Sequence, residues 1–556
     1  MTARIWALEP ERTWGAPGGR IPVVVRLRAD APARGRLQLE LLDVRRVVAT
    51  WDRPVRVAAG ETALRVPVTL PSAGRRGYAF RARLIVDGAS GSWRTVVLEA
   101  IAGWWEAPRH LALTDSADAA DAAGQVAGAR QWHVTVTQAY DWMYRHYRYG
   151  APEEPFTDPL GRRVSHDAVR ALVREGRRAG IATLAYGSVY GAEPEYVARH
   201  PDERVFDEAG EPLSLGGAFY INDIRPGSPW RERLLREYER ACRRFGFDGI
   251  HMDTYGPPHE AIGADGERLL FADLYPGLIA EGARRVAATG HDRRVLFNCV
   301  EGFPLDAVAE APTAAHYLEL WPPDDRYADV VRWIDRARAA GPDKAVVIAA
   351  YIPAMRDARS DPAARAEALE TAVTLTSVIG AAGAFHHTLA EHDRLLVEGY
   401  YPEAVRLRAA EARELRAAFV FGARYLHLLS DPHRRAVVPE ALEVRDSDGL
   451  LVPLSPEPVA GAVWVRGADT AAGRVISLVD LRSQANDRWT EPRQAVEGAR
   501  GWSVRWPGAT APVAMSPWTA NGEARSLRAG HGEGADAPWR LPAFRRWLLL
   551  HDTAEA

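Results

Sequence analysis

Two carboxylic acids in this chain have the setting of a catalytic pair. Asp253 ends the run Phe247-Asp-Gly-Ile-His-Met-Asp253, and Glu319 lies in the apolar run His316-Tyr-Leu-Glu-Leu-Trp321. If the first run is a β-strand, Asp253 shares one face with His251, because side chains alternate along a strand. Most glycosidases use two carboxyl groups, one to attack or stabilise the anomeric carbon and one to protonate the leaving oxygen. The pattern predicts Asp253 for the first role and Glu319 for the second.

Each acid also has a simpler interpretation. Asp253 could cap the following helix or lie at a solvated strand edge, and Glu319 could be a buried partner of one of the many arginines. Apolar and aromatic neighbours would raise the pKa of Glu319 and keep it protonated, as a general acid requires. Glu301, at the end of the preceding strand, is the competing acid. Asp248 points away from the face of Asp253, so we expect a structural hydrogen bond there.

Aromatic and acidic residues also follow other apolar runs. Aromatic rings stack on sugar rings while acids bind hydroxyl groups and move protons, so this mixture favours a polyhydroxylated substrate. Of the pair His386-His387, one imidazole is expected to face the pocket, which we assign to His386, and the other to lie in the core. The other strand ends read Tyr140-Asp-Trp-Met-Tyr-Arg-His146, Tyr186-Gly-Ser-Val-Tyr190, Asn298-Cys-Val-Glu301 and Tyr351.

A (β/α)8 barrel would bring these strand ends together, because the loops after its strands converge on one open face. Between residues 106 and 430, short apolar runs alternate with amphipathic stretches. Two predicted helices are Asp167–Ala179 and Pro229–Phe245, the latter with a cap at Ser228 and a stop at Gly246. A doubly wound sheet is the competing fold, but no Gly-rich phosphate turn supports it. The eight expected strands are Leu111–Thr114, Trp132–Thr137, Ile181–Ala185, Phe247–Met252, Val295–Cys299, Ala315–Leu320, Ala345–Ala350 and Ala384–His387.

Alternation of period two predicts a β-sandwich on each side of this barrel. Residues 1–105 contain runs such as Tyr78–Val86, and residues 431–556 contain runs such as Leu450–Leu454. We therefore expect a multidomain chain. Its parts are an N-terminal immunoglobulin-like β-sandwich (1–105), a catalytic (β/α)8 TIM barrel (106–430) and a C-terminal antiparallel β-sandwich (431–556).

Composition excludes several classes of protein. The 556 residues are 47% hydrophobic and 26% charged, which is ordinary for a globular chain. A net charge of −3 gives no support for nucleic-acid or membrane-surface binding, and no apolar run approaches the ~20 residues of a membrane span. Two cysteines are too few for a disulfide framework. The sequence as written begins without a signal peptide, so we expect a cytoplasmic protein, or a secreted one if a leader was removed.

Two further classes of function remain open. A metal-dependent hydrolase could be assembled around His251-x-Asp253, His259 and His386-His387. Such barrels usually have a His-x-His near the first strand, and here that strand reads Leu111-Ala-Leu-Thr-Asp115. We therefore expect no metal and no other cofactor. The second alternative is a carbohydrate-binding protein without catalysis.

Several segments, in order, resemble glycoside hydrolase family 66, which contains dextranases and the enzymes that make cyclic isomaltooligosaccharides. Gly246–Asp253 is similar to the family's nucleophile segment and Tyr317–Trp321 to its acid/base segment, and the two acids are 66 residues apart. The resemblance runs through the expected barrel into the last domain, while the first domain matches only as a generic sandwich. The other similar segments are Tyr140–His146, Asp158–Arg162, Ala185–Tyr190 and Val479–Trp489.

The resemblance implies retaining hydrolysis of α-1,6-linked glucan, with Asp253 as nucleophile and Glu319 as acid and then base. No inserted carbohydrate-binding module of the kind in cyclising members is present, which favours hydrolysis over the alternative, transglycosylation to (cyclo)isomaltooligosaccharides. The expected partner is an oligo- or polysaccharide, either dextran or imported isomaltooligosaccharides. The substrate-binding residues implied are Tyr140, Asp141, Trp142, Tyr186, Tyr190 and His251, to which we add Trp321 and His386.

Overall fold

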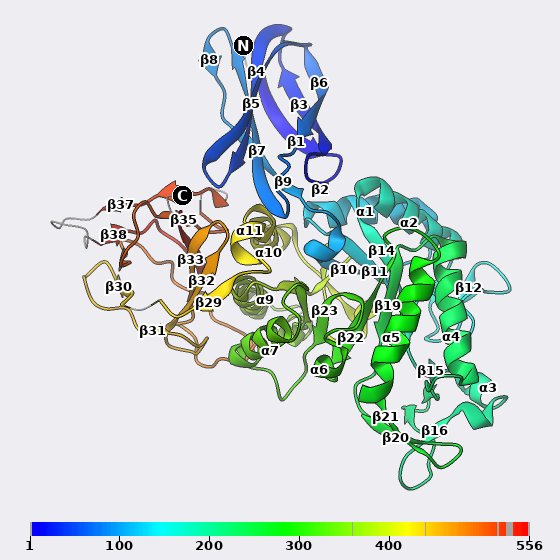
Figure 1. Ribbon diagram of the computed structural model, residues 1–556. Coiled ribbons are helices and arrows are strands. Elements are labelled where there is room, and N and C mark those ends of the chain that lie inside the picture. Colours follow the sequence, from blue (N-terminus) through cyan, green and yellow to red (C-terminus); the bar gives the residue numbers. More distant parts are fainter. Residues whose placement is uncertain (1–2, 359, 440, 520–521, 530–537, 554–556) are drawn as a thin grey trace.

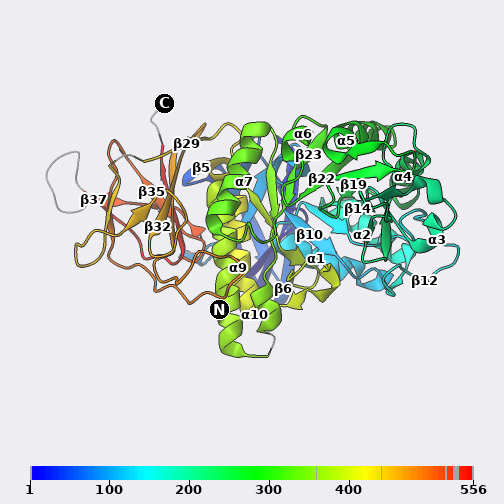
Figure 2. The ribbon, with the colours of Figure 1, turned by 90° about the horizontal axis from the view of Figure 1, so that it is seen from below.

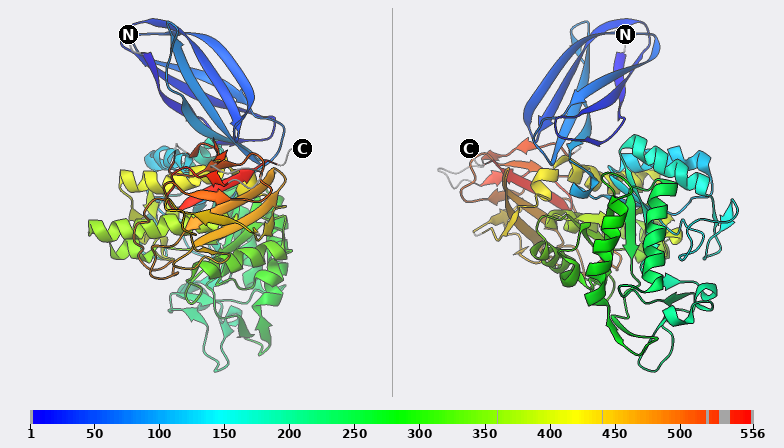
Figure 3. Two further views of the ribbon diagram at one scale, coloured as in Figure 1. Left: turned by 90° about the vertical axis from the view of Figure 1, so that its left-hand side faces the viewer. Right: turned by 45° about the vertical axis from the view of Figure 1, so that its right-hand side comes forward.

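The computed structural model describes residues 3–358, 360–439, 441–519, 522–529 and 538–553. It shows a multidomain chain with a curled parallel sheet in the middle of the sequence and separate sheets towards each end (Figure 1). The N-terminal sheets project from one end of the molecule, and the C-terminal sheets lie beside the central helices (Figures 1 and 3). Among the described helices, none is long and apolar enough to cross a membrane.

The N-terminal part consists of two sheets that share one hydrophobic core. Val23 and Val25 of one sheet and Leu37 and Leu39 of the other are fully buried in it. This spacing by two residues is the alternation that predicted strands in this region. One sheet has the order β1 (Ala3–Pro10), β3 (Arg20–Ala29) and β6 (Gly60–Thr69). The other has the order β2 (Trp14–Gly15), β9 (Arg94–Ala100), β7 (Arg76–Val86), β4 (Ala33–Asp43) and β5 (Arg46–Val57), with β8 (Ala89–Ser90) paired to β7.

The central sheet contains eight strands that pair in parallel and in chain order. After Thr388, the chain continues from the eighth strand into β26 (Leu389–Ala390), which pairs with the first strand at Ala112 and Ala390. The eighth strand region therefore contacts both the seventh and the first strand. The strands are β10 (His110–Leu113), β11 (Val136–Ala139), β14 (Ala182–Ser188), β19 (Gly249–Asp253), β22 (Arg294–Val300), β23 (Thr313–Glu319), β24 (Val346–Ala349) and β25 (Phe385–His387).

Helices connect these strands. The predicted helix Pro229–Phe245 is confirmed in position: α4 (Pro229–Arg240) begins after the Ser228 cap and continues as a π-helical turn. Gly246, with φ of 84°, ends it in the left-handed region that favours glycine. The other main helices are α1 (Ala122–Gln131), α2 (His166–Ala179), α5 (Phe271–Ala287), α6 (Leu305–Val308), α7 (Tyr327–Ala340), α9 (Pro362–Ala382) and α10 (Ala409–Arg424).

One predicted strand is shifted. The run Trp132–Thr137 was expected to be extended, but β11 begins only at Val136. The backbone N–H of Trp132 still bonds to the carbonyl of Ala129 at the end of α1, and His133 has φ of 55°. Trp132 does not belong to a strand. Its apolar side chain is buried because it packs beside Phe419, with ring centroids 5.6 Å apart. A short apolar run does not distinguish a strand from such packing.

Small sheets follow the carboxyl ends of several central strands. They are insertions between strand and helix after β11, β14 and β19, and most of them lie together at the lower right of Figure 1. The pairs and triplets are β12 (Phe156–Thr157) with β13 (Arg163–Val164); β15 (Gly191–Ala192), β18 (Phe219–Ile221) and β17 (Ser214–Leu215); and β16 (Val205–Phe206), β20 (Glu260–Gly263) and β21 (Arg268–Leu270).

The C-terminal part also has two sheets with a common core, which includes Val504 of one sheet and Leu548 of the other. The predicted strand Leu450–Leu454 is largely irregular, because only Leu454 belongs to a strand. The larger sheet has the order β29 (Arg435–Val437), β32 (Val463–Thr470), β33 (Gly473–Asp480), β39 (Trp547–Asp552), β35 (Val513–Met515) and β36 (Arg525–Ser526), with β31 (Leu454–Ser455) on β32. The smaller sheet has β30 (Glu443–Arg445), β34 (Ser503–Arg505), β38 (Trp539–Arg540) and β37 (Arg528–Ala529).

Candidate active site

A cavity of about 310 Å³ lies at the carboxyl end of the central sheet. Both predicted catalytic acids line it, each as the last residue of its strand, Asp253 of β19 and Glu319 of β23. The insertions supply part of the wall, including Leu215 and Phe219. The lining residues are Gln138, Tyr140, Asp141, His146, Leu160, Tyr186, Leu215, Phe219, His251, Asp253, Thr254, Tyr255, Val300, Glu301, Glu319, Trp321, Gly399 and Tyr401.

Asn298 connects the two acids. It belongs to β22, which lies between β19 and β23 in the sheet. Its Nδ2 donates to Asp253 Oδ1 at 2.7 Å and to Glu319 Oε2 at 2.6 Å. Because one nitrogen makes both bonds, these two oxygens are at most about 5.3 Å apart, the sum of the two lengths. Retaining glycosidases hold their carboxyl groups ~5–5.5 Å apart, and inverting ones ~6.5–9.5 Å.

Glu319 has two further donors. The Tyr351 hydroxyl donates to Glu319 Oε1 at 2.8 Å, and the Trp321 indole N–H donates to the same oxygen at 3.1 Å. Tyr351 in turn lies within 3.1 Å of the Tyr401 hydroxyl. The carboxylate is therefore fixed in orientation by groups from three segments of the chain, which is what a general acid needs if it is to meet the leaving oxygen.

The ionisation of each of the two acids depends on the other. Burial and the charge of Glu319 raise the pKa of Asp253 to about 7, while hydrogen bonds from Asn298 and Tyr186 act in the opposite direction. Burial also raises the pKa of Glu319 against the lowering effect of its three donors. Two carboxyl groups this close do not ionise together easily, which favours a state in which the pair retains one proton. In that state one acid is able to attack while the other donates a proton.

Asp141 lines the cavity together with the carboxyl groups of Asp253, Glu319 and Glu301. Its backbone has φ of 43°, a left-handed conformation that is uncommon outside glycine and often found at functional sites. Its oxygens lie 3.8 Å from His146 Nε2 and 3.8 Å from Arg162 Nη2. Both distances are longer than a hydrogen bond. Asp141 is thus held between two cations while its lone pairs remain available to the hydroxyl groups of a ligand.

The comparison with protein families covers nearly the whole chain. The model of glycosyl hydrolase family 66 matches residues 13–504. The chain belongs to glycosyl hydrolase family 66. Two curated relatives of this family 66 chain are both named cycloisomaltooligosaccharide glucanotransferase, from Niallia circulans. They are 22% identical over 362 residues and 26% identical over 243 residues. The matches cover 60% and 40% of this chain but only 37% and 25% of the relatives, so the chain spans well under half of their length.

Solved structures share the fold. A Paenibacillus sp. cycloisomaltooligosaccharide glucanotransferase complexed with cycloisomaltoheptaose has a TM-score of 0.85 at 17% identity, over 98% of this chain and 99% of that one. An α-amylase from Geobacillus thermoleovorans, complexed with acarbose, is more distant, with a TM-score of 0.51 at 9% identity over 81% of this chain and 99% of that one. At these identities the likeness concerns the fold alone.

In this family 66 chain, seven of the ten predicted site residues meet at the cavity. They are the two acids together with Tyr140, Asp141, Tyr186, His251 and Trp321. The other three, Trp142, Tyr190 and His386, do not line it.

Trp142 and Tyr190 lie behind the cavity wall. Trp142 is fully buried, with its ring 4.5 Å from that of Phe247, and its indole N–H donates to the carbonyl of Tyr186 at 3.1 Å. The Tyr190 hydroxyl accepts the backbone N–H of Tyr255 at 2.7 Å. Both side chains therefore support residues of the wall and do not reach a ligand in the cavity. Sequence order alone does not reveal this, because both lie among residues that do line it.

His386 faces the helices. Its two ring nitrogens contact Thr376 Oγ1 of α9 at 2.9 Å and the Ala350 carbonyl at 3.0 Å. The next residue, His387, points to the interior of the sheet, where the Tyr317 hydroxyl lies 2.6 Å from its Nδ1. Alternation correctly places the two imidazoles on opposite faces of β25, but neither of them lines the cavity, so the expected pocket-facing imidazole is not found in this pair.

Sequence reasoning also left functional neighbours unassigned. The sequence predicts Asn298 and Tyr351 only as strand ends. Asn298 follows Leu296 by two residues, so it lies on the same inward face of β22, and this spacing could have indicated its place in the site. His146 lies inside a family-like segment and lines the cavity without having been assigned a role. Tyr401 comes from a loop far along the chain, and no pattern in the sequence indicates its position.

The metal-dependent alternative receives no support from the described part of the chain. Within it, no three His, Cys, Asp or Glu side chains are grouped as a metal ion requires. His259, one of the residues invoked for such a site, stacks on Phe303 with ring centroids 3.7 Å apart and does not line the cavity.

Proposed function

We propose that this family 66 protein cleaves α-1,6-glucosidic bonds in dextran or isomaltooligosaccharides by double displacement and transfers the released glucosyl chain to an acceptor sugar. The observation that carries the proposal is the pair of carboxyl groups on one Asn298 amide, at most about 5.3 Å apart. This separation suits a retaining mechanism, because it leaves no room for a water molecule between the sugar and the second carboxylate.

In the first step, Asp253 attacks the anomeric carbon and Glu319 gives its proton to the leaving glycosidic oxygen. The products of this step are a free sugar chain and a glucosyl ester of Asp253. In the second step, Glu319 takes a proton from the incoming hydroxyl, whose oxygen displaces Asp253 and restores both acids. A sugar hydroxyl gives transfer, and a hydroxyl of the same chain gives a ring. Water gives hydrolysis, the outcome that the resemblance to the family implied.

The comparisons favour transfer over hydrolysis as the main outcome, because both curated relatives and the similar solved structure are named as glucanotransferases. The expectation of hydrolysis depended on a missing inserted module. However, the solved glucanotransferase is matched over 99% of its chain, so no large module of that solved chain lies outside the match.

The proposed mechanism also depends on a finer description of the fold. We infer that the curled sheet is a (β/α)8 barrel, supported by the pairing of Ala112 with Ala390 across its first and last strands. We further propose β-sandwiches at residues 1–105 and 431–556, with the barrel at 106–430. In such a barrel the loops after the strands surround the active site, as the insertions around this cavity do.

The test is a product profile on dextran and on a defined isomaltooligosaccharide series. We expect longer and cyclic products by mass spectrometry, with few new reducing ends, and NMR should show the α-anomer first. New reducing ends in proportion to the bonds cleaved would establish hydrolysis instead, and initial release of the β-anomer would overturn the retaining mechanism. Asp253→Gly with azide should yield a β-glucosyl azide, because a small anion then attacks from the side of the missing carboxylate. Glu319→Gly, treated in the same way, should not yield it.

A further inference from the structure

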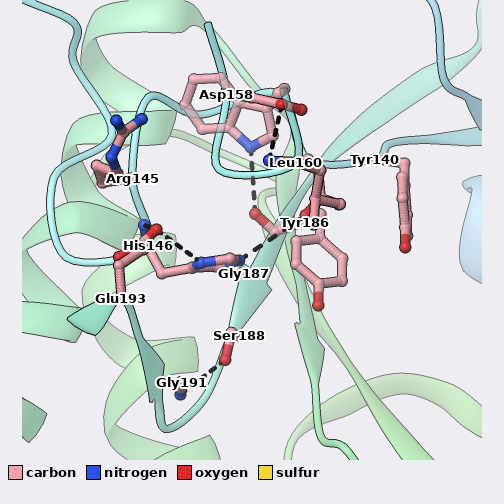
Figure 4. Close-up of polar contacts among 12 residues, drawn as sticks. Tyr140, Arg145, His146, Asp158, Leu160, Tyr186, Gly187, Ser188, Gly191 and Glu193 are labelled. Atoms are coloured by element: carbon pink, nitrogen blue, oxygen red, sulfur yellow. Dashed lines mark hydrogen bonds and ion pairs between the residues drawn. The ribbon is translucent and has the colours of Figure 1, made fainter. Parts of the chain in front are cut away.

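His146 is a buried imidazole at the wall of the catalytic cavity and lies between the carboxylates of Glu193 and Asp141. Figure 4 shows its contact with Glu193. Its Nδ1 lies 3.0 Å from Glu193 Oε1, and its Nε2 lies 3.8 Å from Asp141 Oδ1. The same Glu193 oxygen accepts the backbone N–H of His146 at 2.8 Å. The side chains of His146, Asp141 and Glu193 are only 3%, 7% and 5% exposed. The ring is therefore fixed from behind by Glu193 and faces Asp141 in front.

The surroundings of His146 favour its charged form. Burial by itself lowers the pKa of His146, but the negative charges of Glu193 and Asp141 and the hydrogen bond with Glu193 reverse this effect and raise it to about 10. Burial likewise opposes ionisation of Glu193, yet the charge of His146 lowers the pKa of that carboxyl. His146 also makes T-shaped ring contacts with Phe219 and Tyr186, with ring centroids 4.7 Å and 6.2 Å away.

We propose that His146 is a positioning residue, an imidazolium cation that fixes the carboxylate of Asp141 with its oxygens towards the glucosyl unit in the cavity. This proposal rests on the function proposed above and deepens it. His146 itself does not touch the reacting atoms. Its effect passes through Asp141, and Glu193 is the counter-ion that keeps the ring charged and in place.

The proposal explains why the cavity contains so many acids. Asp253, Glu319 and Glu301 already line it, so nearby cations offset the repulsion that a fourth carboxylate meets there. The second cation, Arg162, is shared, because its guanidinium also binds Asp158 at 2.7 Å. His146 is thus the cation that faces Asp141 from the cavity wall. A charged acceptor binds a sugar hydroxyl more strongly than a neutral carboxyl group does.

The functional test uses the α-1,6 substrate that the wild type turns over, together with its monodeoxy analogues at the reacting glucose. If Asp141 binds one hydroxyl, removal of that hydroxyl should lower wild-type kcat/KM by roughly 10- to 100-fold. In Asp141→Asn and in His146→Gln, removal of the same hydroxyl should lower kcat/KM by less than about 5-fold, because the charged contact is already weakened. If removal of the hydroxyl lowers kcat/KM by the same factor in His146→Gln as in the wild type, the proposal is wrong.

His166→Gln is the matched control. His166 is also buried, and its Nδ1 lies 2.5 Å from a carboxylate oxygen of Glu154, but it lies on α2 and outside the cavity. We expect this variant to lose stability and to keep the wild-type discrimination among deoxy substrates. A merely structural role for His146 would make the two variants behave alike.

A spectroscopic test does not depend on the substrate. In protein labelled with ¹⁵N-histidine, the signal of His146 is assigned by its loss in His146→Gln. We expect both ring nitrogens to show imidazolium shifts at pH 8, and Glu193→Gln should lower the pH at which they change. A neutral His146 at pH 8 would overturn the proposal even if the enzyme transfers glucans. Conversely, absence of turnover on any α-1,6 glucan would refute the proposed function and leave this measurement decisive for His146.

Discussion

At the residue scale, the catalytic geometry depends on one amide. Asn298 lies 45 residues from Asp253 and 21 from Glu319 in sequence, yet one nitrogen donates to both. In Asn298→Ala both acids lose a donor to their charged form, so both apparent pKa values rise. We expect kcat/KM to fall about 100-fold and the whole pH–activity profile to move to higher pH. A shift to lower pH would contradict this assignment.

Asn222→Ala provides the control for this change. Asn222 is buried and its side chain donates to the carbonyls of Tyr190 and Tyr220, but it does not line the cavity. Its loss should lower the thermal midpoint and leave the pH optimum unchanged.

The pH dependence of activity should separate the two acids. Activity requires an ionised Asp253 and a protonated Glu319, so the profile is bell-shaped, with both apparent pKa values raised by burial. Tyr351 donates to Glu319 and not to Asp253, so in Tyr351→Phe the anion of Glu319 loses a donor and its pKa rises. The alkaline limb should therefore move to higher pH while the acidic limb moves little. Tyr327→Phe, a buried tyrosine of α7 outside the cavity, should leave both limbs in place.

At the element scale, β19 positions Asp253 because its residues pack closely between neighbouring strands. A Cβ added to Gly249 would lie 1.9 Å from the carbonyl oxygen of Arg294 on β22. We expect Gly249→Ala to destabilise the protein by about 3 kcal/mol or more, because backbone must shift in a packed sheet. Thermal or urea unfolding checks this. Gly128→Ala on α1, where a Cβ has no neighbour within 4 Å, should instead stabilise by about 0.5–1 kcal/mol.

At the scale of the whole molecule, α9 packs against both the central sheet and the C-terminal sheets and lies between them (Figure 2). Arg546, next to β39, makes a bidentate ion pair with Glu370 of α9, with both bonds at 2.5 Å and side chains 4% and 3% exposed. Glu370→Gln leaves Arg546 with Glu414 as its remaining counter-ion, because Arg546 Nη1 also donates to Glu414 Oε1 at 2.5 Å. Loss of the charge-assisted bonds to Glu370 costs about 1.5–3 kcal/mol. We expect Glu370→Gln to lower the free energy of unfolding by that amount and to leave kcat/KM at low temperature unchanged.

Asp52→Asn offers the comparison for this ion pair. Asp52 pairs with Arg36 on the N-terminal sheets, with side chains 40% and 66% exposed. Solvent screens such a pair, so its loss should change stability by less than about 1 kcal/mol. A similar loss in both variants would show that α9 does not depend on the buried pair.

Much of the fold and part of the site could be read from local pattern. The helix after Ser228 ends at Gly246 as its capping residues predict, because capping and a left-handed glycine are local properties of the sequence. Asp253 and Glu319 were found because each ends an apolar strand. The pattern gave a wrong strand at Trp132. This apolar residue packs against Phe419 of α10, which is distant in the sequence, and β11 begins only at Val136.

The sequence by itself determined which residues end the central strands and that acids and aromatic rings are concentrated there. Only the tertiary structure decided which of those side chains meet. It turned His387 inward and His386 towards α9, placed Trp142 behind the wall, and put Asn298 between the two acids. The reason is physical: periodicity defines two faces of a strand, but the face that becomes the interior, and the distant residues it meets there, are set by how the strands pair and curl.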